Sequence, residues 1–299
     1  MSDAAEAIGR RGSALEVFAV FLRLGCTSFG GPIAHLGYLR EEIVVRRRWL
    51  DDRAYADIVA LAQFLPGPAS SQAGMAIGLG RAGLPGALAA WLGFTLPSAV
   101  LMVLFAYGVA EWGGALGEGW LQGLKTVAVA IVAQAIWGMA RNLCPDRERA
   151  ALAAAAVALV VAIPGTTGQL AAIAAGALAG AAFLRGVAPP AAAHLVAGVD
   201  RPTAVACLAL FVALLVLPPL VADATGAVAL FEKFYRAGSL VFGGGHVVLP
   251  LLQSELVEPG WIHREGFVAG YGAAQAVPGP LFTFAAYLGA AMGVEPNGL

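Results

Sequence analysis

Long apolar stretches alternate with short polar ones along most of the chain. A run of about 18 or more apolar residues is long enough to cross a bilayer as a helix, and the clearest runs lie at 85–110, 119–140 and 203–221. Two shorter stretches, 149–163 and 169–184, reach that length only with their flanking residues. The pattern therefore predicts an all-α, polytopic membrane protein that sits in a lipid bilayer.

The composition supports this prediction and excludes several other classes of protein. The chain has 59% hydrophobic and 12% charged residues, whereas a soluble domain usually has about 25% charged residues. The net charge of −1 gives no case for nucleic-acid binding. Cys26, Cys144 and Cys207 are scattered and lack a CxxC spacing, which argues against a disulfide framework or a zinc site. We expect neither a metal nor a cofactor.

Two helix-breaking motifs occur twice, in the same order. FGGP at 29–32 and FLPGP at 64–68 return as FGGG at 242–245 and AVPGP at 276–280. The two copies align with an offset of 213 residues, which becomes 212 after one deletion. Among the identical pairs are Arg23/Arg236, Gly25/Gly238, Glu42/Glu255, Trp49/Trp261 and Gln63/Gln275. The identities gather on glycine, proline and charged positions, which indicates an internal duplication.

The duplication predicts the domain organisation. We expect residues 14–186 to form the first repeat, 187–228 a connecting segment with a linking transmembrane helix, and 229–299 the second repeat. Only residues 281–299 follow the PGP motif of the second copy, whereas further helices follow that of the first. On this basis we expect the second repeat to be truncated.

The charges of equivalent loops predict that the two copies face opposite sides of the membrane. Cytoplasmic loops carry an excess of Lys and Arg. The segment 40–53 holds five arginines, whereas its counterpart 253–265 holds one arginine and three glutamates. Five predicted crossings separate the copies, and an odd number inverts the second. The sequence therefore predicts an inverted-topology repeat with helices broken at the FGG and PGP motifs, either as re-entrant hairpins or as kinked single spans.

The interruptions are the predicted binding region. Glycine and proline free backbone groups at a depth where only protein or a water-filled cavity can satisfy them. In transporters the N-termini of half-helices point their positive dipole ends at anions, and small hydroxyl and amide side chains flank the breaks here. The predicted substrate-binding residues are Arg23, Thr27, Ser28, Gly30, Gly31, Gln63, Pro66, Gly67, Ser70, Ser71, Arg236, Gly243, Gly244, Gln275 and Gly279.

Each of these features also has a simpler interpretation. The glycine and proline motifs could be packing kinks without a ligand, and the two repeated arginines could extend to the membrane interface. Thr27 and Ser28 could bond back to helix carbonyls. His35 and His246 are not equivalent positions, and a polar packing role is the simpler interpretation for each. The arginines at 46–48 are typical of a topology signal, and Trp49 and Trp261 of interfacial anchors.

Together, these motifs resemble the chromate ion transporter family, in its long-chain, two-domain form. The stretch from Phe21 to Gly78, with FGGP and FLPGP, resembles the first-half signature of the family. The stretch from Phe234 to Pro280, with FGGG and AVPGP, resembles its second-half signature. The resemblance implies a multi-pass protein of the cell inner membrane that exports chromate without ATP and confers chromate resistance.

Two other classes of function compete with a secondary transporter. HExxH, GxSxG, paired catalytic carboxylates and Cys/His clusters are missing from the sequence, so an intramembrane enzyme is disfavoured. A channel or a membrane scaffold is the third class. The chemistry favours a small tetrahedral oxyanion, but sulfate has the same charge as chromate and a similar size. Sulfate or another oxyanion therefore stays open as the substrate, as does a homodimer.

Overall fold

The computed structural model contains helices and no strand among the residues that it describes. It describes residues 12–112, separate positions within 119–141, and 144–163, 166–183, 199–221, 226–241 and 248–293. The helices of the first copy are α2 (Ala14–Thr27), α3 (Gly31–Arg40), the π-helix η1 (Glu41–Arg46), α4 (Asp52–Phe64), α5 (Ala69–Trp112), α7 (Arg147–Ala162) and α8 (Thr166–Phe183). The expected span at 119–140 falls largely outside the described residues.

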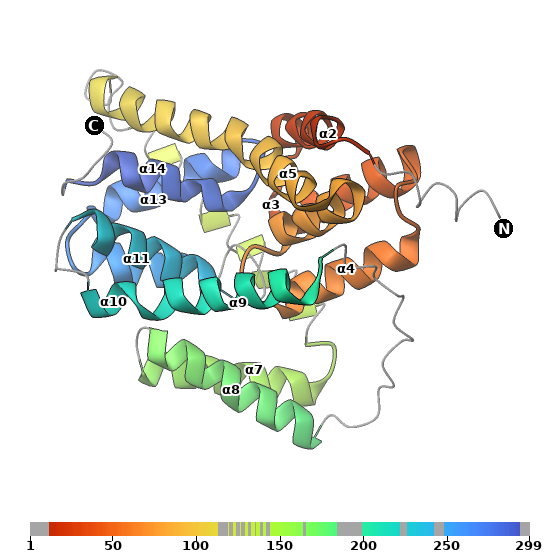
Figure 1. Cartoon of the computed structure of the whole chain (residues 1–299). Coiled ribbons are helices and arrows are strands. Elements are labelled where there is room, and N and C mark those ends of the chain that lie inside the picture. The colour runs from red at the N-terminus through yellow and green to blue at the C-terminus, as the bar shows by residue number, and fades with distance from the viewer. Residues whose placement is uncertain are drawn as a thin grey trace.

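The remaining helices belong to the connecting segment and the second copy (Figure 1). They are α9 (Arg201–Val216), α10 (Pro218–Val221), α11 (Ala227–Ser239), α12 (Val248–Leu252), the π-helix η3 (Gln253–Val257), α13 (Arg264–Ala276), the 3-10 helix η4 (Leu281–Thr283) and α14 (Phe284–Ala291). The prediction of an all-α protein is confirmed for the described part of the chain.

Local sequence signals set the helix starts. Ser13 caps α2 by accepting a hydrogen bond from the Glu16 backbone N–H at 3.1 Å, and Asp51 caps α4 by accepting one from Ala54 at 2.7 Å. Such caps satisfy N–H groups that have no partner inside the helix. Along α2, Val17, Val20, Phe21 and Leu24 are buried. This spacing places them on one face of the helix.

Helix α5 is two helices joined by a sharp turn. Ala82 and Gly83 leave helical geometry, and Gly83 has φ +66°. The helices on either side approach so closely that a Cβ on Gly78 would lie 2.3 Å from the Gly86 carbonyl oxygen. The expected span at 85–110 is thus the longer arm of a tight hairpin, and α2 packs along α5 (Figure 1).

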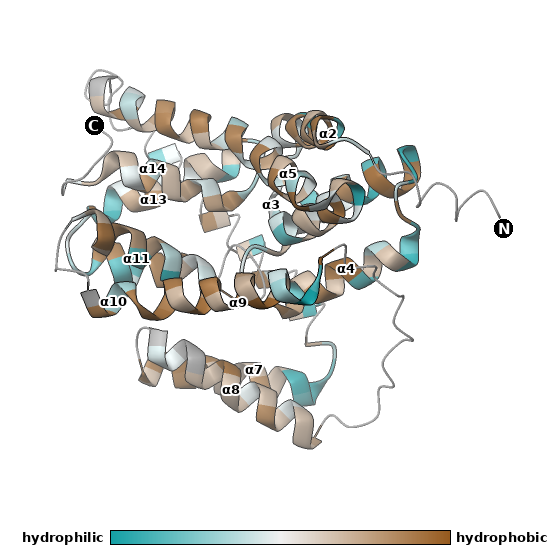
Figure 2. Ribbon diagram, viewed as in Figure 1, coloured by the Kyte–Doolittle hydropathy of each residue, from teal (hydrophilic) through white to brown (hydrophobic). Residues whose placement is uncertain are grey.

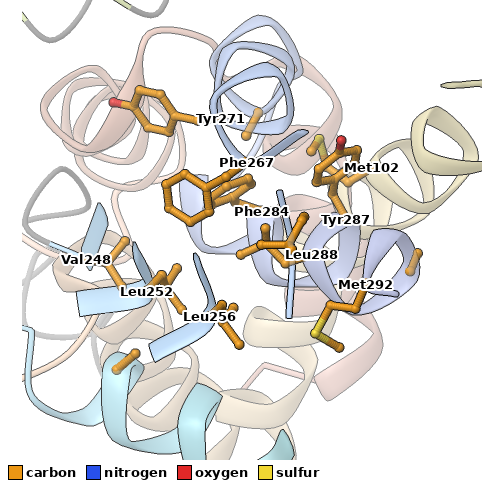
Figure 3. Packing of buried hydrophobic residues seen from close by; sticks show 14 of the residues in the cluster. Met102, Val248, Leu252, Leu256, Phe267, Tyr271, Phe284, Tyr287, Leu288 and Met292 are labelled. Carbon is orange, nitrogen blue, oxygen red and sulfur yellow. The ribbon is translucent and has the colours of Figure 1, made fainter. Parts of the chain in front are cut away.

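Two separate hydrophobic clusters form the core, one around each set of motifs. The first cluster joins α2, α3, α4 and α5 around Phe21, Ile43 and Phe94. The second joins the helices of the second copy to Met102 and Ala106 of α5. Figure 3 shows Phe267, Phe284, Tyr287 and Leu288 gathered in this second cluster.

The helices outside these clusters are apolar on surfaces that no other described segment covers. No residue of α7 or α9 is buried, and Figure 2 shows apolar residues along both helices. The stretches 69–110 and 201–220 are long and apolar enough to cross a membrane, and three shorter apolar helices accompany them. Large uncovered apolar surfaces are typical of contact with lipid or protein.

Candidate functional site: the joint between interrupted helices

The first interruption separates α2 from α3 at the FGGP motif. Helix α2 ends at Thr27, and Ser28 adopts an extended conformation. Gly30 and Gly31 follow with φ of +95° and +78°, and Pro32 lies in the first turn of α3. Positive φ at both residues requires glycine, because a Cβ would be strained there. The motif therefore sets a sharp break rather than a gentle kink.

The second interruption separates α4 from α5 at the first PGP motif. Helix α4 ends at Phe64, and Gly67 has φ +121°. The Gln72 side chain reaches back and donates a hydrogen bond from Nε2 to the Pro66 carbonyl oxygen at 2.6 Å. Ser70 and Ser71, in the first turn of α5, are 4% and 6% exposed. The polar side chains expected after this motif thus face the protein interior.

The second copy repeats this geometry where the structure describes it. Helix α13 ends at Ala276, and Gly279 has φ +102°. The Thr283 hydroxyl donates to the Pro280 carbonyl oxygen at 2.8 Å. Gly243 and Gly244, with the rest of the FGGG motif, lie outside the described residues.

Two backbone hydrogen bonds join the interruptions of one copy to those of the other. The Gly67 N–H donates to the Val241 carbonyl at 2.7 Å, and the Gly279 N–H donates to the Ser28 carbonyl at 2.8 Å. In the sequence alignment Gly67 matches Gly279, and Ser28 matches Val241. The two bonds are therefore equivalent, with donor and acceptor exchanged between copies. We call this pair of bonds the reciprocal joint.

Three buried polar atoms beside the first copy's interruptions have no hydrogen-bond partner among the described residues: Ser28 Oγ, His35 Nδ1 and Gln72 Oε1. Ser28 and His35 are each 1% exposed. Buried polar atoms without partners are rare in folded proteins and call for an explanation. Ser28 was among the predicted site residues. His35 and Gln72 were not, although each lies within five residues of a break.

The other predicted site residues take different positions. Gln275 lies near the joint, because its Oε1 would be 4.0 Å from a Cβ on Gly31, and its Nε2 donates to the Tyr271 hydroxyl at 2.7 Å. Thr27 is exposed and bonds back to the Arg23 carbonyl at 2.8 Å. Arg23 is exposed on α2. Thr27 therefore bonds back to a helix carbonyl, as the simpler interpretation predicted. Ser28 Oγ makes no such bond among the described residues.

Gln63 lines a groove between α3 and α4. The groove has a volume of about 520 Å³, with Leu36, Gly37 and Arg40 on one side and residues of α4 from Asp52 to Gln63 on the other. Arg40 pairs with Asp52 at 2.6 Å, and the Tyr55 hydroxyl donates to the Leu36 carbonyl at 2.6 Å. The groove thus runs from the arginine-rich segment to a point three residues before the first PGP motif.

The segments that follow α3 and α12 are partly helical rather than simple loops. A π-helix lies in each, η1 in the first copy and η3 in the second. Each is followed by the same contact: the Trp49 N–H donates to the Ile43 carbonyl at 2.9 Å, and the Trp261 N–H to the Leu256 carbonyl at 2.8 Å. The expectation of simple loops at 40–53 and 253–265 was wrong, because the helix continues for about another turn at the start of each segment.

Charged side chains cover these two tryptophans, which are 7% and 6% exposed. Arg81 lies 4.9 Å from the Trp49 ring and Lys233 lies 5.3 Å from the Trp261 ring. Lys233 also pairs with Glu255 at 3.3 Å. In this structure the tryptophans are packed under cations rather than freely exposed at an interface.

The Arg236 side chain belongs to the same charged group. It pairs with Glu232 and lies 4.0 Å from Glu255. Its first-copy equivalent, Arg23, is exposed. The two repeated arginines therefore differ in surroundings. Across the described residues, no group of three or more His, Cys, Asp or Glu could hold a metal ion.

Interrupted helices that meet inside a membrane protein are typical of transporters. Comparison with known proteins gives the family. Residues 15–181 and 228–298 match the chromate transporter family. The chain therefore belongs to that family.

Curated relatives are similar over most of this chain. It is 29% identical to a chromate transport protein of Pseudomonas aeruginosa over 92% of its length, and 28% identical to one of Cupriavidus metallidurans over 92%. A probable chromate transport protein of Synechococcus elongatus is 28% identical over 90%. The chain spans 65–67% of the length of these three proteins. No solved structure matches it.

Proposed function

We propose that the protein is a secondary transporter that exports chromate across the cytoplasmic membrane and so confers resistance to it. The observation that carries the proposal is the reciprocal joint, where interruptions from both copies meet through the backbone hydrogen bonds Gly67–Val241 and Gly279–Ser28. Interrupted helices place helix N-termini, with their positive dipole ends, at a point where an anion can use them. The family's named transporters support chromate as the substrate.

We further propose that the two copies are inverted within a multi-pass inner-membrane protein. The support is the opposite charge of segments 40–53 and 253–265, together with an odd number of predicted crossings between the copies. An exchange of donor and acceptor, as in the reciprocal joint, is what a two-fold relation between copies produces. Single cysteines placed in the two segments should react with a membrane-impermeant reagent from opposite sides. Labelling of both from one side would refute the inversion.

The proposed pathway follows the interruptions and their polar neighbours. It comprises Arg23, Thr27, Ser28, Gly30, Gly31, Gln63, Pro66, Gly67, Ser70, Ser71, Arg236, Gly243, Gly244, Gln275 and Gly279. We expect Gly31→Leu and Gly67→Leu to abolish efflux while the protein still inserts, because both glycines have positive φ. Normal transport by both variants at matched expression would remove this assignment.

Uptake of radiolabelled chromate into inverted vesicles tests the function directly. Vesicles with the protein should accumulate chromate saturably when energised, and control vesicles should not. Unlabelled sulfate as competitor tests the alternative substrate, because full competition at equal concentration would make the protein a general oxyanion transporter. Flux that does not saturate would indicate a channel. Cross-linking in the same vesicles tests whether the protein forms a homodimer.

A further inference from the structure

The two copies differ in the side chains that they bury at the joint. In the first copy Ser28 and His35 present polar atoms, and each is 1% exposed. The equivalent residues of the second copy are Val241 and Val248, which are 0% and 3% exposed. Valine cannot hydrogen-bond through its side chain, so the polar pair has no counterpart across the joint.

The local geometry places the polar pair directly beside the joint. His35 lies one turn after Gly31 on α3, and its imidazole lies close to the backbone of Ser28. Its ring stands nearly perpendicular to that of Phe94, with centroids 5.5 Å apart. The Ser28 carbonyl also accepts the Gly279 N–H. His35 therefore lies beside the residue through which the second copy is attached.

The unpaired atoms have the chemistry that an oxyanion needs. A serine hydroxyl can donate one hydrogen bond, and an imidazole nitrogen that carries hydrogen can donate another. Hydrogen bonds to charged groups are stronger than those between neutral groups. Ser28 Oγ and His35 Nδ1 are buried without partners among the described residues. Ser28 precedes α3 and His35 lies in its second turn, and the N-terminus of a helix attracts anions.

We propose that Ser28 Oγ and His35 Nδ1 are ligands of the transported oxyanion, so that the first copy supplies side-chain ligands at its first interruption and the equivalent valines of the second copy supply none. This inference rests on the proposed function and adds His35 to the site. It also assigns the two copies different roles: a substitution in the first copy changes affinity for the anion, and the equivalent substitution in the second does not.

The test replaces each polar residue with the residue that the second copy carries. In inverted vesicles, Ser28→Val and His35→Val should each raise the KM for chromate about tenfold or more, the effect of losing a hydrogen bond to a charged group. His35→Gln should recover part of the affinity, because its amide can still donate. Val248→Ala is the matched control from the second copy and should keep the KM within about twofold of wild type.

Equilibrium binding of radiolabelled chromate to the purified full chain provides a second measurement. It separates a binding role from a packing role, since a packing residue changes stability without changing the dissociation constant of the folded protein. Ser28→Ala removes only the hydroxyl and serves where His35→Val does not reach the membrane. A KM and a dissociation constant unchanged in Ser28→Ala, and unchanged in His35→Val where that variant reaches the membrane, would overturn the inference.

The same experiments distinguish this failure from failure of the proposed function. If wild-type vesicles transport chromate saturably and the variants keep its KM, only the assignment of Ser28 and His35 falls. If the wild-type protein neither transports nor binds chromate or sulfate, the proposed function falls and the ligand assignment falls with it.

Discussion

The two copies have similar interruptions but surround them with different side chains. Gly67 and Gly279 have similar positive φ and equivalent hydrogen bonds. After the first PGP motif come Ser70, Ser71 and Gln72, whereas the second is followed by Phe282, Thr283 and Phe284. Figure 3 shows Phe284 inside the aromatic cluster of the second copy.

This difference indicates that backbone shape and polar lining are separable properties of the joint. The glycines and prolines set the break in both copies, and the side chains around it then diverge. One copy keeps polar atoms at the break, while the other packs aromatic rings against Gly270 and Phe267. The comparison predicts that equivalent substitutions will have unequal effects.

The largest inequality is expected at the two PGP glycines. A Cβ on Gly279 would lie 2.6 Å from Ser98 Oγ and 3.2 Å from the Gly25 carbonyl oxygen. A Cβ on Gly67 would meet the flexible end of Gln72, which can move. We expect Gly279→Ala to destabilise the protein by about 2–5 kcal/mol and Gly67→Ala by about 1–2 kcal/mol.

Thermal unfolding of the purified variants in detergent, monitored by intrinsic fluorescence, measures this difference. The order of the two midpoints is the test. Equal unfolding temperatures for the two variants would contradict the prediction, because they would show that the atoms around Gly279 move aside for a Cβ as easily as the Gln72 side chain does.

A second inequality is expected at the paired helix glycines Gly25 and Gly238. A Cβ on Gly25 would lie 2.7 Å from the Gly93 carbonyl oxygen, because α2 packs closely on α5. No atom lies within 4 Å of a Cβ on Gly238. We expect Gly25→Ala to cost about 1–3 kcal/mol, and Gly238→Ala to be neutral or stabilising by up to about 1 kcal/mol.

The ratio of folded to aggregated protein after heating, read by size-exclusion chromatography, follows both variants side by side. A stable Gly25→Ala protein would contradict the close contact between α2 and α5. Gly25→Ala combined with Gly93→Ala should be worse than either alone, since both glycines lie at the same crossing.

The smallest inequality is expected at the repeated arginines. Arg236→Gln removes the contacts to Glu232 and Glu255 in a partly buried group, and we expect a loss of about 1 kcal/mol. Arg23→Gln affects an exposed side chain and should change stability by less than about 0.5 kcal/mol. Unfolding of both variants by urea or heat measures the two losses of stability. A larger loss for Arg23→Gln than for Arg236→Gln would contradict the prediction.

Transport by the same pair of variants separates stability from function. Both arginines are in the proposed pathway set, so each substitution should lower chromate uptake whatever its effect on folding. Unchanged uptake in Arg23→Gln would move Arg23 out of the pathway and leave it as an exposed basic residue.

The breaks could be predicted from the sequence because glycine and proline act locally. Positive φ at Gly30, Gly31 and Gly67 follows from the motifs themselves. The helical ends at Thr27 and Phe64 are likewise local. The π-helix at Glu41–Arg46 was missed, since its charged residues also suit a loop and no short motif marks an extra residue in a helical turn.

The candidate site was only partly accessible to sequence reasoning. His35 was interpreted as a packing residue because a lone histidine in an apolar helix gives no sign of its partners. Its unpaired nitrogen becomes evident only when Phe94 and Ser28, from other segments, are placed around it. The burial of Trp49 under Arg81 also depends on residues distant in sequence.

The reciprocal joint is made of main-chain atoms alone. Its acceptors are present whatever residue occupies position 28 or 241. The contact between the copies can therefore persist when these side chains are substituted. Each copy holds one half of each bond. A chain with a single copy would leave an amide and a carbonyl at its breaks without these partners, and a second such chain could supply them.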